Sequence, residues 1–221
     1  INSILFDLDD TLIDNPMHAF IPAYFSALMK KVAALVQPHK FIDQLRKSTR
    51  AMVKNTNPAL TNEQVFAADF FSKLGVPREP LMLLFDDFYA REYRDLRAYV
   101  QSIDGAEGVV ARAFERNRRV VIATNPLFPR TAIVQRIEWG KLDHFDYTLV
   151  TDYETMHATK PNPAYYREIA TRLGVEPNEC VMVGNDEGND IAPARQVGMK
   201  TFWITDADAR STDVATDWHG T

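Results

Sequence analysis

A short apolar run followed at once by acids constrains the fold more than any other feature of the chain. Ile4–Phe6 is a continuous apolar run of the kind that forms a strand buried on both faces of a parallel sheet. Asp7, Asp9 and Asp10 follow it directly. In open α/β sheets, ligands bind just beyond the carboxyl ends of the strands. The segment therefore predicts a buried strand with an acidic site at its end, although Asp9 and Asp10 are also common turn formers.

Further apolar or β-branched runs predict the rest of a parallel sheet. Segments with helical spacing lie between these runs, and one of them stops at Gly174, a residue typical of helix C-terminal caps. Strands that alternate with helices indicate an α/β fold with right-handed crossovers. The additional predicted strands are Val120–Ala123, Tyr147–Val150, Val181–Val183 and Thr201–Ile204.

Residues 15–99 follow a different pattern, which predicts an inserted all-helical domain. They contain a single glycine, Gly75, and apolar residues recur three or four positions apart in four successive segments. The third segment opens with Thr61-Asn62-Glu63-Gln64, which is similar to a capping box, and closes at Gly75. We therefore expect two domains: an α/β core formed by residues 1–14 and 100–221, and a helical domain formed by residues 15–99.

Two other predicted strands also end in polar groups. Thr124 and Asn125 follow the second strand, and the segment Gly184–Asp190 (GNDEGND) follows the fourth. Lys160 lies in a loop before a predicted helix. Because ligands bind at the carboxyl edge of such a sheet, we expect these side chains to converge on Asp7.

Converging carboxylates predict a hard metal ion. Two carboxylates roughly 4 Å apart repel by about 4 kcal/mol at an effective dielectric constant of about 20. Asp7, Asp9, Asp186 and Asp190 would therefore need a cation, and Lys160 is the one fixed positive charge among these segments. The ligands are carboxylate and carbonyl oxygens without a Cys/His cluster, so Mg²⁺ fits the site and zinc does not.

Four segments of the chain resemble the four motifs of the haloacid dehalogenase-like (HAD) hydrolase superfamily and follow one another in the same order. They are FDLDDTL (Phe6–Leu12), ATN (Ala123–Asn125), TKP (Thr159–Pro161) and VGNDEGND (Val183–Asp190). The resemblance implies a Rossmann-like parallel-sheet core with a helical C1 cap, which would be residues 15–99. It also implies phosphoryl transfer, a reaction catalysed mainly by positioning and charge neutralisation.

The resemblance implies a role for each catalytic residue. Asp7 would be the nucleophile that forms an aspartyl-phosphate. Asp9 would protonate the leaving alkoxide and then activate water. Thr124 and Asn125 would bind the phosphoryl oxygens, and Lys160 would neutralise charge on the nucleophile and on the phosphate.

The resemblance also implies a set of Mg²⁺ ligands. These would be Asp7, the backbone carbonyl of Asp9, and Asp186, with Asp190 fixing the geometry. Family members place an Asp directly after the glycine, whereas Asn185 takes that position here. Either Asn185 or Asp186 can occupy this place, and we favour Asp186 because it lies four residues before Asp190.

Asp9 favours a phosphatase, because dehalogenase and ATPase-like members of the family differ at that position. We expect hydrolysis of a small phosphorylated metabolite of the phosphoglycolate, sugar-phosphate or nucleotide type. The alternatives are a phosphomutase of the same superfamily and a catalytically weak, phosphate-binding regulatory relative. The glycine-rich motifs of dinucleotide-binding enzymes and of P-loop proteins do not occur in the sequence.

Composition argues against several other classes of protein. The formal net charge of −5 is opposite to the basic excess of a generic nucleic-acid binder. Apolar runs such as Leu81–Phe85 are far shorter than the ~20 residues of a membrane span. The single cysteine, Cys180, cannot form an internal disulfide, and no secretory leader is recognised. We expect a cytoplasmic enzyme without a nucleic-acid, membrane or obligate protein partner.

Overall fold

The computed structural model describes residues 1–205 and 215–221. Within these residues, one parallel sheet has the strand order β5-β4-β1-β6-β7-β8. The strands are β1 (Ser3–Phe6), β4 (Arg119–Ile122), β5 (Leu149–Val150), β6 (Cys180–Gly184), β7 (Lys200–Ile204) and β8 (Trp218–Gly220). The predicted α/β class is confirmed. The edge strand β8 was not predicted.

Strand β1 lies at the centre of the sheet, where the chain order reverses. Leu5 of β1 pairs with Val121 of β4 on one side and with Met182 of β6 on the other. Such a reversal opens a crevice at the carboxyl ends of the strands. The segments that follow β1, β4 and β6 therefore meet at one place.

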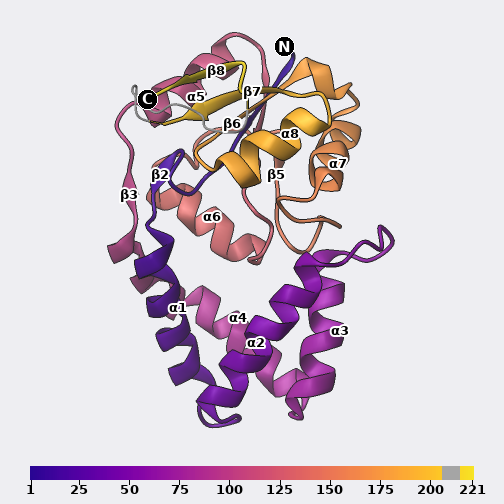
Figure 1. Ribbon diagram of the computed structural model, residues 1–221. Coiled ribbons are helices and arrows are strands. Elements are labelled where there is room, and N and C mark those ends of the chain that lie inside the picture. The colour runs from indigo at the N-terminus through magenta and orange to yellow at the C-terminus, as the bar shows by residue number, and fades with distance from the viewer. Residues whose placement is uncertain (206–214) are drawn as a thin grey trace.

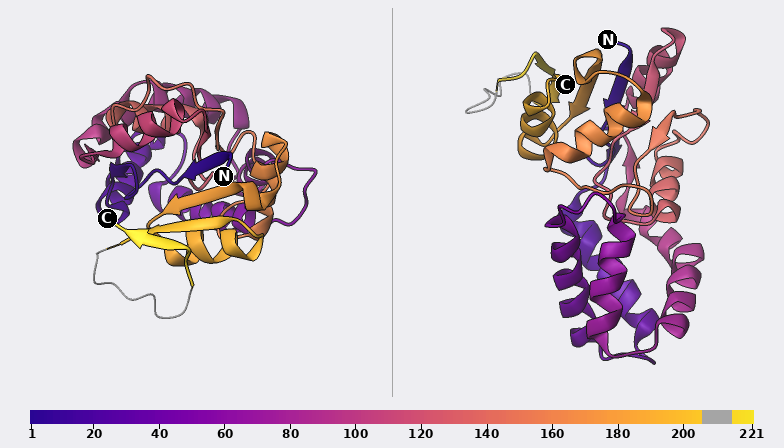
Figure 2. Two further views of the ribbon diagram at one scale, coloured as in Figure 1. Left: turned by 90° about the horizontal axis from the view of Figure 1, so that it is seen from above. Right: turned by 90° about the vertical axis from the view of Figure 1, so that its right-hand side faces the viewer.

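Alternating side chains along the strands build an apolar layer on each face of the sheet. Phe6 and Ile122 belong to the layer that α5 and α6 cover, whereas Leu5 and Met182 belong to the layer under α7 and α8. The two helix layers are visible on either side of the sheet in the left view of Figure 2. The helices are α5 (Ala106–Glu115), α6 (Arg130–Trp139), α7 (Pro163–Leu173) and α8 (Ala192–Gln196). Burial on both faces explains why the strands are continuously apolar.

The stretch between β2 (Ile13–Asp14) and β3 (Gln101–Ser102) is helical, as predicted. It contains α1 (Met17–Val32), α2 (Pro38–Val53), α3 (Asn62–Leu74), α4 (Arg78–Ala90) and the 3₁₀ segment η1 (Glu92–Tyr99). These inserted helices lie at the end of the core opposite the chain termini (Figure 1). Strands β2 and β3 pair antiparallel, so the two connections to the core run side by side.

Helix α3 begins and ends as the sequence predicts. The Thr61 side chain accepts a hydrogen bond from the Gln64 N–H, and the Gln64 side chain accepts one from the Thr61 N–H. The helix ends at Gly75, whose φ of 75° is a left-handed conformation that glycine adopts without strain. The capping box and the glycine cap are therefore confirmed.

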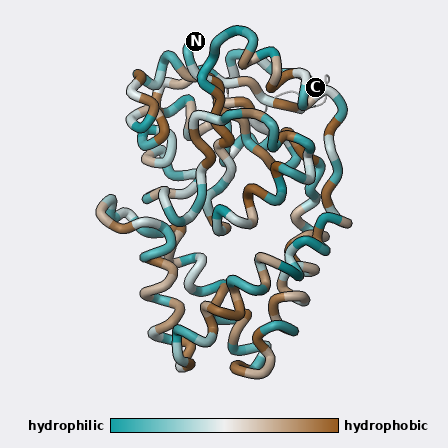
Figure 3. Tube along the Cα trace, turned by 180° about the vertical axis from the view of Figure 1, so that it is seen from behind, coloured by the Kyte–Doolittle hydropathy of each residue, from teal (hydrophilic) through white to brown (hydrophobic). Residues whose placement is uncertain are grey.

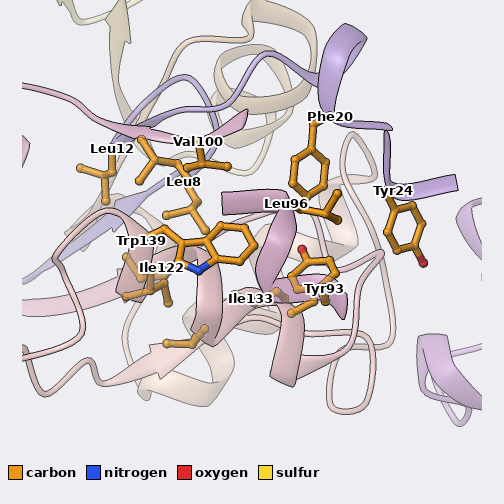
Figure 4. Packing of buried hydrophobic residues seen from close by; sticks show 14 of the residues in the cluster. Leu8, Leu12, Phe20, Tyr24, Tyr93, Leu96, Val100, Ile122, Ile133 and Trp139 are labelled. Atoms are coloured by element: carbon orange, nitrogen blue, oxygen red, sulfur yellow. The ribbon is translucent and has the colours of Figure 1, made fainter. Parts of the chain in front are cut away.

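One apolar cluster extends from the inserted helices into the core. Phe20 of α1 and Tyr93 of η1 pack beside Leu8 and Trp139 of the core (Figure 4). The rings of Tyr93 and Trp139 stack with their centroids 5.4 Å apart. In Figure 3, hydrophobic stretches run through the middle of the core and alternate with hydrophilic ones along the inserted helices. No helix of the described residues has the length and apolar character needed to cross a membrane.

Asn62, at the start of α3, joins the inserted helices to two loops of the core. Its Nδ2 donates to the carbonyl oxygens of Ala158 at 3.2 Å and Pro126 at 3.5 Å. Its backbone N–H donates to the Met156 carbonyl at 2.8 Å. Because Asn62 is fully buried, these bonds are shielded from water.

We predict that Asn62→Ala lowers the free energy of unfolding by about 1–3 kcal/mol, because it leaves buried carbonyl groups with fewer partners. Asn57→Ala is the matched control. Asn57 lies in an exposed loop, and its side chain accepts only a local bond from the Ala59 N–H. The control should change the free energy by less than about 0.5 kcal/mol. Urea denaturation measures both, and equal effects would show that Asn62 does not join the two parts.

Candidate active site

The crevice at the end of β1 holds a buried lysine between two carboxylates. Lys160 Nζ lies 2.6 Å from Asp7 Oδ1 and 2.6 Å from Asp190 Oδ1. Asp7 directly follows β1, Asp190 belongs to a π-helical turn after β6 (Glu187–Ile191), and Lys160 precedes α7. All three residues are buried. The structure thus brings together three residues that are far apart in the sequence.

Burial and charge act against each other in this cluster. Burial raises the pKa of Asp7 to about 7, although Lys160 beside it acts in the opposite direction. Burial by itself lowers the pKa of Lys160, but the charges of Asp190 and Asp7 outweigh it and raise this pKa well above its usual value. With both carboxylates ionised, one lysine leaves an excess of negative charge. A divalent cation would offset this charge and favour the ionised form of Asp7.

Asn125 and Thr124 connect the loop after β4 to the same cluster. Asn125 Oδ1 accepts a hydrogen bond from the backbone N–H of Lys160 at 3.2 Å. The carbonyl of Thr124 accepts bonds from Thr151 Oγ1 at 2.7 Å and from Tyr165 Oη at 2.9 Å. These bonds fix the loop beside Lys160, which is where a phosphate-binding loop is expected.

Asp9 is held by two residues that sequence reasoning missed. Its Oδ2 accepts a hydrogen bond from Arg136 Nη1 at 2.6 Å, and its Oδ1 accepts one from Asn15 Nδ2 at 2.7 Å. Arg136 lies on α6, is 1% exposed, and has the Phe128 ring 4.9 Å from its guanidinium carbon. Arg136 lies between the apolar residues Ile133 and Ile137 in the sequence, and this was the available signal, since a buried charge needs a partner.

After β6, the side chains of Asn185 and Asp186 have different partners. Asp186 Oδ1 accepts hydrogen bonds from the N–H groups of Gly188 and Asn189, so its side chain caps the helical turn. By contrast, Asn185 Oδ1 lies 3.3 Å from Thr11 Oγ1, which in turn lies 3.3 Å from Asp7 Oδ2. Asn185, rather than Asp186, is therefore linked to the Asp7 carboxylate through Thr11.

The oxygen atoms around Asp7 suit a hard cation. Asp7 Oδ2 and Asn185 Oδ1 lie on either side of Thr11. Both are oxygen donors of the kind that Mg²⁺ binds. In the part of the chain that the structure describes, no three His, Cys, Asp or Glu side chains form a ready metal cluster. Magnesium binding here would therefore use an amide and backbone oxygen, and the ligand set stays a prediction.

The fold is a parallel sheet with helices inserted after its first strand, and a lysine bridges two carboxylates at the end of that strand. The chain matches the model of the haloacid dehalogenase-like hydrolase family over residues 1–198. It belongs to this family and is a hydrolase, so the resemblance seen in the motifs is confirmed.

Relatives named as phosphatases align over most of the chain. The sequence is 26% identical to a glyceraldehyde 3-phosphate phosphatase from Pyrococcus abyssi, over 92% of this chain and 81% of the relative. It is 28% identical to a phosphoglycolate phosphatase from Xanthomonas campestris, over 89% of this chain and 80% of the relative. The structure resembles a 2-haloacid dehalogenase from Pseudomonas syringae with a TM-score of 0.66, at 22% identity and over 99% and 93% of the two chains. This likeness confirms the fold.

We predict that Gly184→Ala destabilises the protein by about 1–3 kcal/mol, because an added Cβ would overlap the Asp190 carboxylate. Asp190 cannot move away without losing its contact with Lys160. Gly108→Ala is the matched control, since a Cβ there meets nothing within 4 Å. Gly108 lies in α5, so the control should stabilise the protein by about 0.5–1 kcal/mol. Thermal and urea unfolding measure both, and the same sign for the two variants would contradict this packing.

Proposed function

We propose that the protein is a Mg²⁺-dependent phosphatase that hydrolyses a small phosphorylated metabolite through an aspartyl-phosphate intermediate. The observation that supports this most is the Asp7 carboxylate, buried at the end of β1 with one oxygen held by Lys160. A fixed carboxylate beside a positive charge is suited to attack on an anionic phosphorus centre. The phosphatase names of relatives that align over most of the chain agree with this class of reaction.

In the first step, Asp7 would attack the phosphorus atom. Oδ2 lies on the Asn185 side, where the cation would be held, so the attacking oxygen would be Oδ1, which Lys160 contacts. A bond forms between Oδ1 and phosphorus while the bond from phosphorus to the ester oxygen breaks. Asp9 would give a proton to the leaving oxygen, which departs as the alcohol.

In the second step, Asp9 would take a proton from water, which attacks the phosphorus of the aspartyl-phosphate. The products are inorganic phosphate and free Asp7. Arg136 and Asn15 would keep the Asp9 carboxylate oriented through both steps. Fixed geometry of this kind is one of the larger contributions to catalysis.

Thr124, Asn125 and Lys160 would bind the phosphoryl oxygens. The side chains of Asp7 and Asn185 and the backbone carbonyl of Asp9 would hold the Mg²⁺ ion, which supplies charge neutralisation when bound. Asp190 would position Lys160, whose Nζ donates a hydrogen bond to Asp190 Oδ1. Its Oδ2 accepts a hydrogen bond from the Asp186 N–H at 3.1 Å, which would position the loop after β6. The substrate would be of the phosphoglycolate, sugar-phosphate or nucleotide type.

Phosphate release from a panel of these esters tests the proposal. We expect turnover with Mg²⁺, loss of turnover with a chelator, and at least an approximately thousandfold loss of kcat in Asp7→Asn. Asp14→Asn is the matched control, because Asp14 is exposed and lies outside the crevice. It should retain full activity. Turnover in the chelator, or full activity of Asp7→Asn, would contradict the mechanism, whereas phosphoryl return to the product would indicate a phosphomutase.

Two further substitutions test the metal ligands. Asn185→Asp should lower the Mg²⁺ concentration needed for half-maximal activity by roughly tenfold, because it places a carboxylate beside Asp7. Asp186→Asn should leave that concentration within about twofold, since Asp186 caps a turn. For both variants, Mg²⁺ is titrated while phosphate release is followed, and Mg²⁺ binding is measured separately by calorimetry. A large effect of Asp186→Asn with none from Asn185→Asp would restore Asp186 as the ligand.

A further inference from the structure

A cavity of about 970 Å³ lies between the inserted helices and the loop that follows β4. Its volume is at the upper end of the range of ligand pockets in proteins, about 300–1,000 Å³. Aromatic side chains from three of the inserted helices and from the core face it. They are Tyr24, Phe25, Phe66, Phe85, Tyr89, Phe128 and Tyr153.

Most of the residues that line this cavity are apolar or aromatic, and six are charged. Asp86, Arg94, Arg130 and Glu138 are exposed to solvent, whereas Glu63 and Glu154 are half-buried. A small, highly charged alcohol would lose water against the apolar part of this lining without gaining partners there. The wall also offers the hydroxyls of Tyr24 and Tyr89, which lie 2.8 Å apart and can bind a heteroatom.

The cavity begins close to the candidate catalytic groups. Leu127 and Phe128 line it and follow Asn125 by two and three residues. The ring of Phe128 also covers the guanidinium of Arg136, which contacts Asp9. Phe128 therefore lies both in the wall of the cavity and against the arginine that contacts the candidate proton donor.

We propose that the cavity receives the alcohol part of the substrate and that this alcohol carries a large apolar or aromatic ring. The proposal rests on the proposed phosphatase function and narrows its substrate class. An aromatic ring would pack edge-to-face or offset against the phenyl and phenol walls, an arrangement that adds to the free energy of burial. A two- or three-carbon acid would fill little of the volume.

The test compares 1-naphthyl phosphate with 2-phosphoglycolate on the full chain with Mg²⁺. Val134→Trp narrows the cavity, because Val134 lines it and is 43% exposed. Val109→Trp is the matched control, since Val109 is 53% exposed, lies on α5 and does not line the cavity. Both substitutions add the same bulk at exposed valines, so folding should be retained in both.

We expect kcat/KM of the unmodified chain to be at least about tenfold higher for 1-naphthyl phosphate. Val134→Trp should lower that value by about tenfold or more and leave the value for 2-phosphoglycolate within about twofold. Val109→Trp should change neither. A preference for 2-phosphoglycolate, or equal effects of the two variants, would overturn the proposal.

Binding of 1-naphthyl sulfate separates failure of the cavity proposal from failure of the proposed function. This ester carries the ring but no phosphorus, so its binding does not depend on turnover. If no phosphate ester is hydrolysed, the phosphatase function fails. Weaker binding of the sulfate to Val134→Trp than to Val109→Trp, measured by calorimetry, would still support a ring-binding cavity. Equal binding to both variants would overturn it.

Discussion

Lys160 places a buried positive charge between Asp7 and Asp190, and the loops around it keep that charge in position. Removing one member of a buried, hydrogen-bonded charge pair typically costs about 3–5 kcal/mol, because the partner is left without compensation. Here the lysine compensates the charges of two carboxylates. Without it, the carboxylates of Asp7 and Asp190 would repel each other with no positive charge between them. The same contact fixes the Asp7 carboxylate, which in the proposed mechanism is the nucleophile.

Three separate segments of the fold bring Asp7, Asp190 and Lys160 together. Strand β1 carries Asp7 to the middle of the sheet, and the reversal of strand order brings the ends of β4 and β6 to either side. Asn125 then bonds the backbone of Lys160, while Asn62 bonds the carbonyls of Pro126 and Ala158 near both residues. Asn62 thus bonds the inserted helices to the loops that carry Asn125 and Lys160, so a movement of those helices would also move these loops.

The sequence was informative where one local signal determined the structure. Strands buried on both faces have continuous apolar runs, and Thr61 with Gly75 marked both ends of α3. The convergence at Asp7 followed from where strands end in any parallel sheet. Strands β2, β3 and β8 were not predicted, because each has only two or three residues and so shows no periodic pattern in the sequence.

Residues whose positions depend on distant partners could not be assigned in this way. Spacing favoured Asp186 as a metal ligand, but its carboxylate caps a π-helical turn, and Asn185 is instead linked to the Asp7 carboxylate through Thr11. Arg136 pairs with Asp9, which lies 127 positions earlier in the chain. The aromatic cavity forms only when helices from separate segments close on α6, so no single stretch of sequence predicts it.

A crystal structure of the protein with Mg²⁺ and beryllium trifluoride, which mimics a phosphoryl group on a carboxylate, tests the central claim most directly. We predict beryllium bonded to Asp7 Oδ1, with Lys160 still beside it and the metal bound by Asp7 Oδ2 and Asn185. Beryllium bonded to another carboxylate, or a metal bound away from Asp7, would contradict the account.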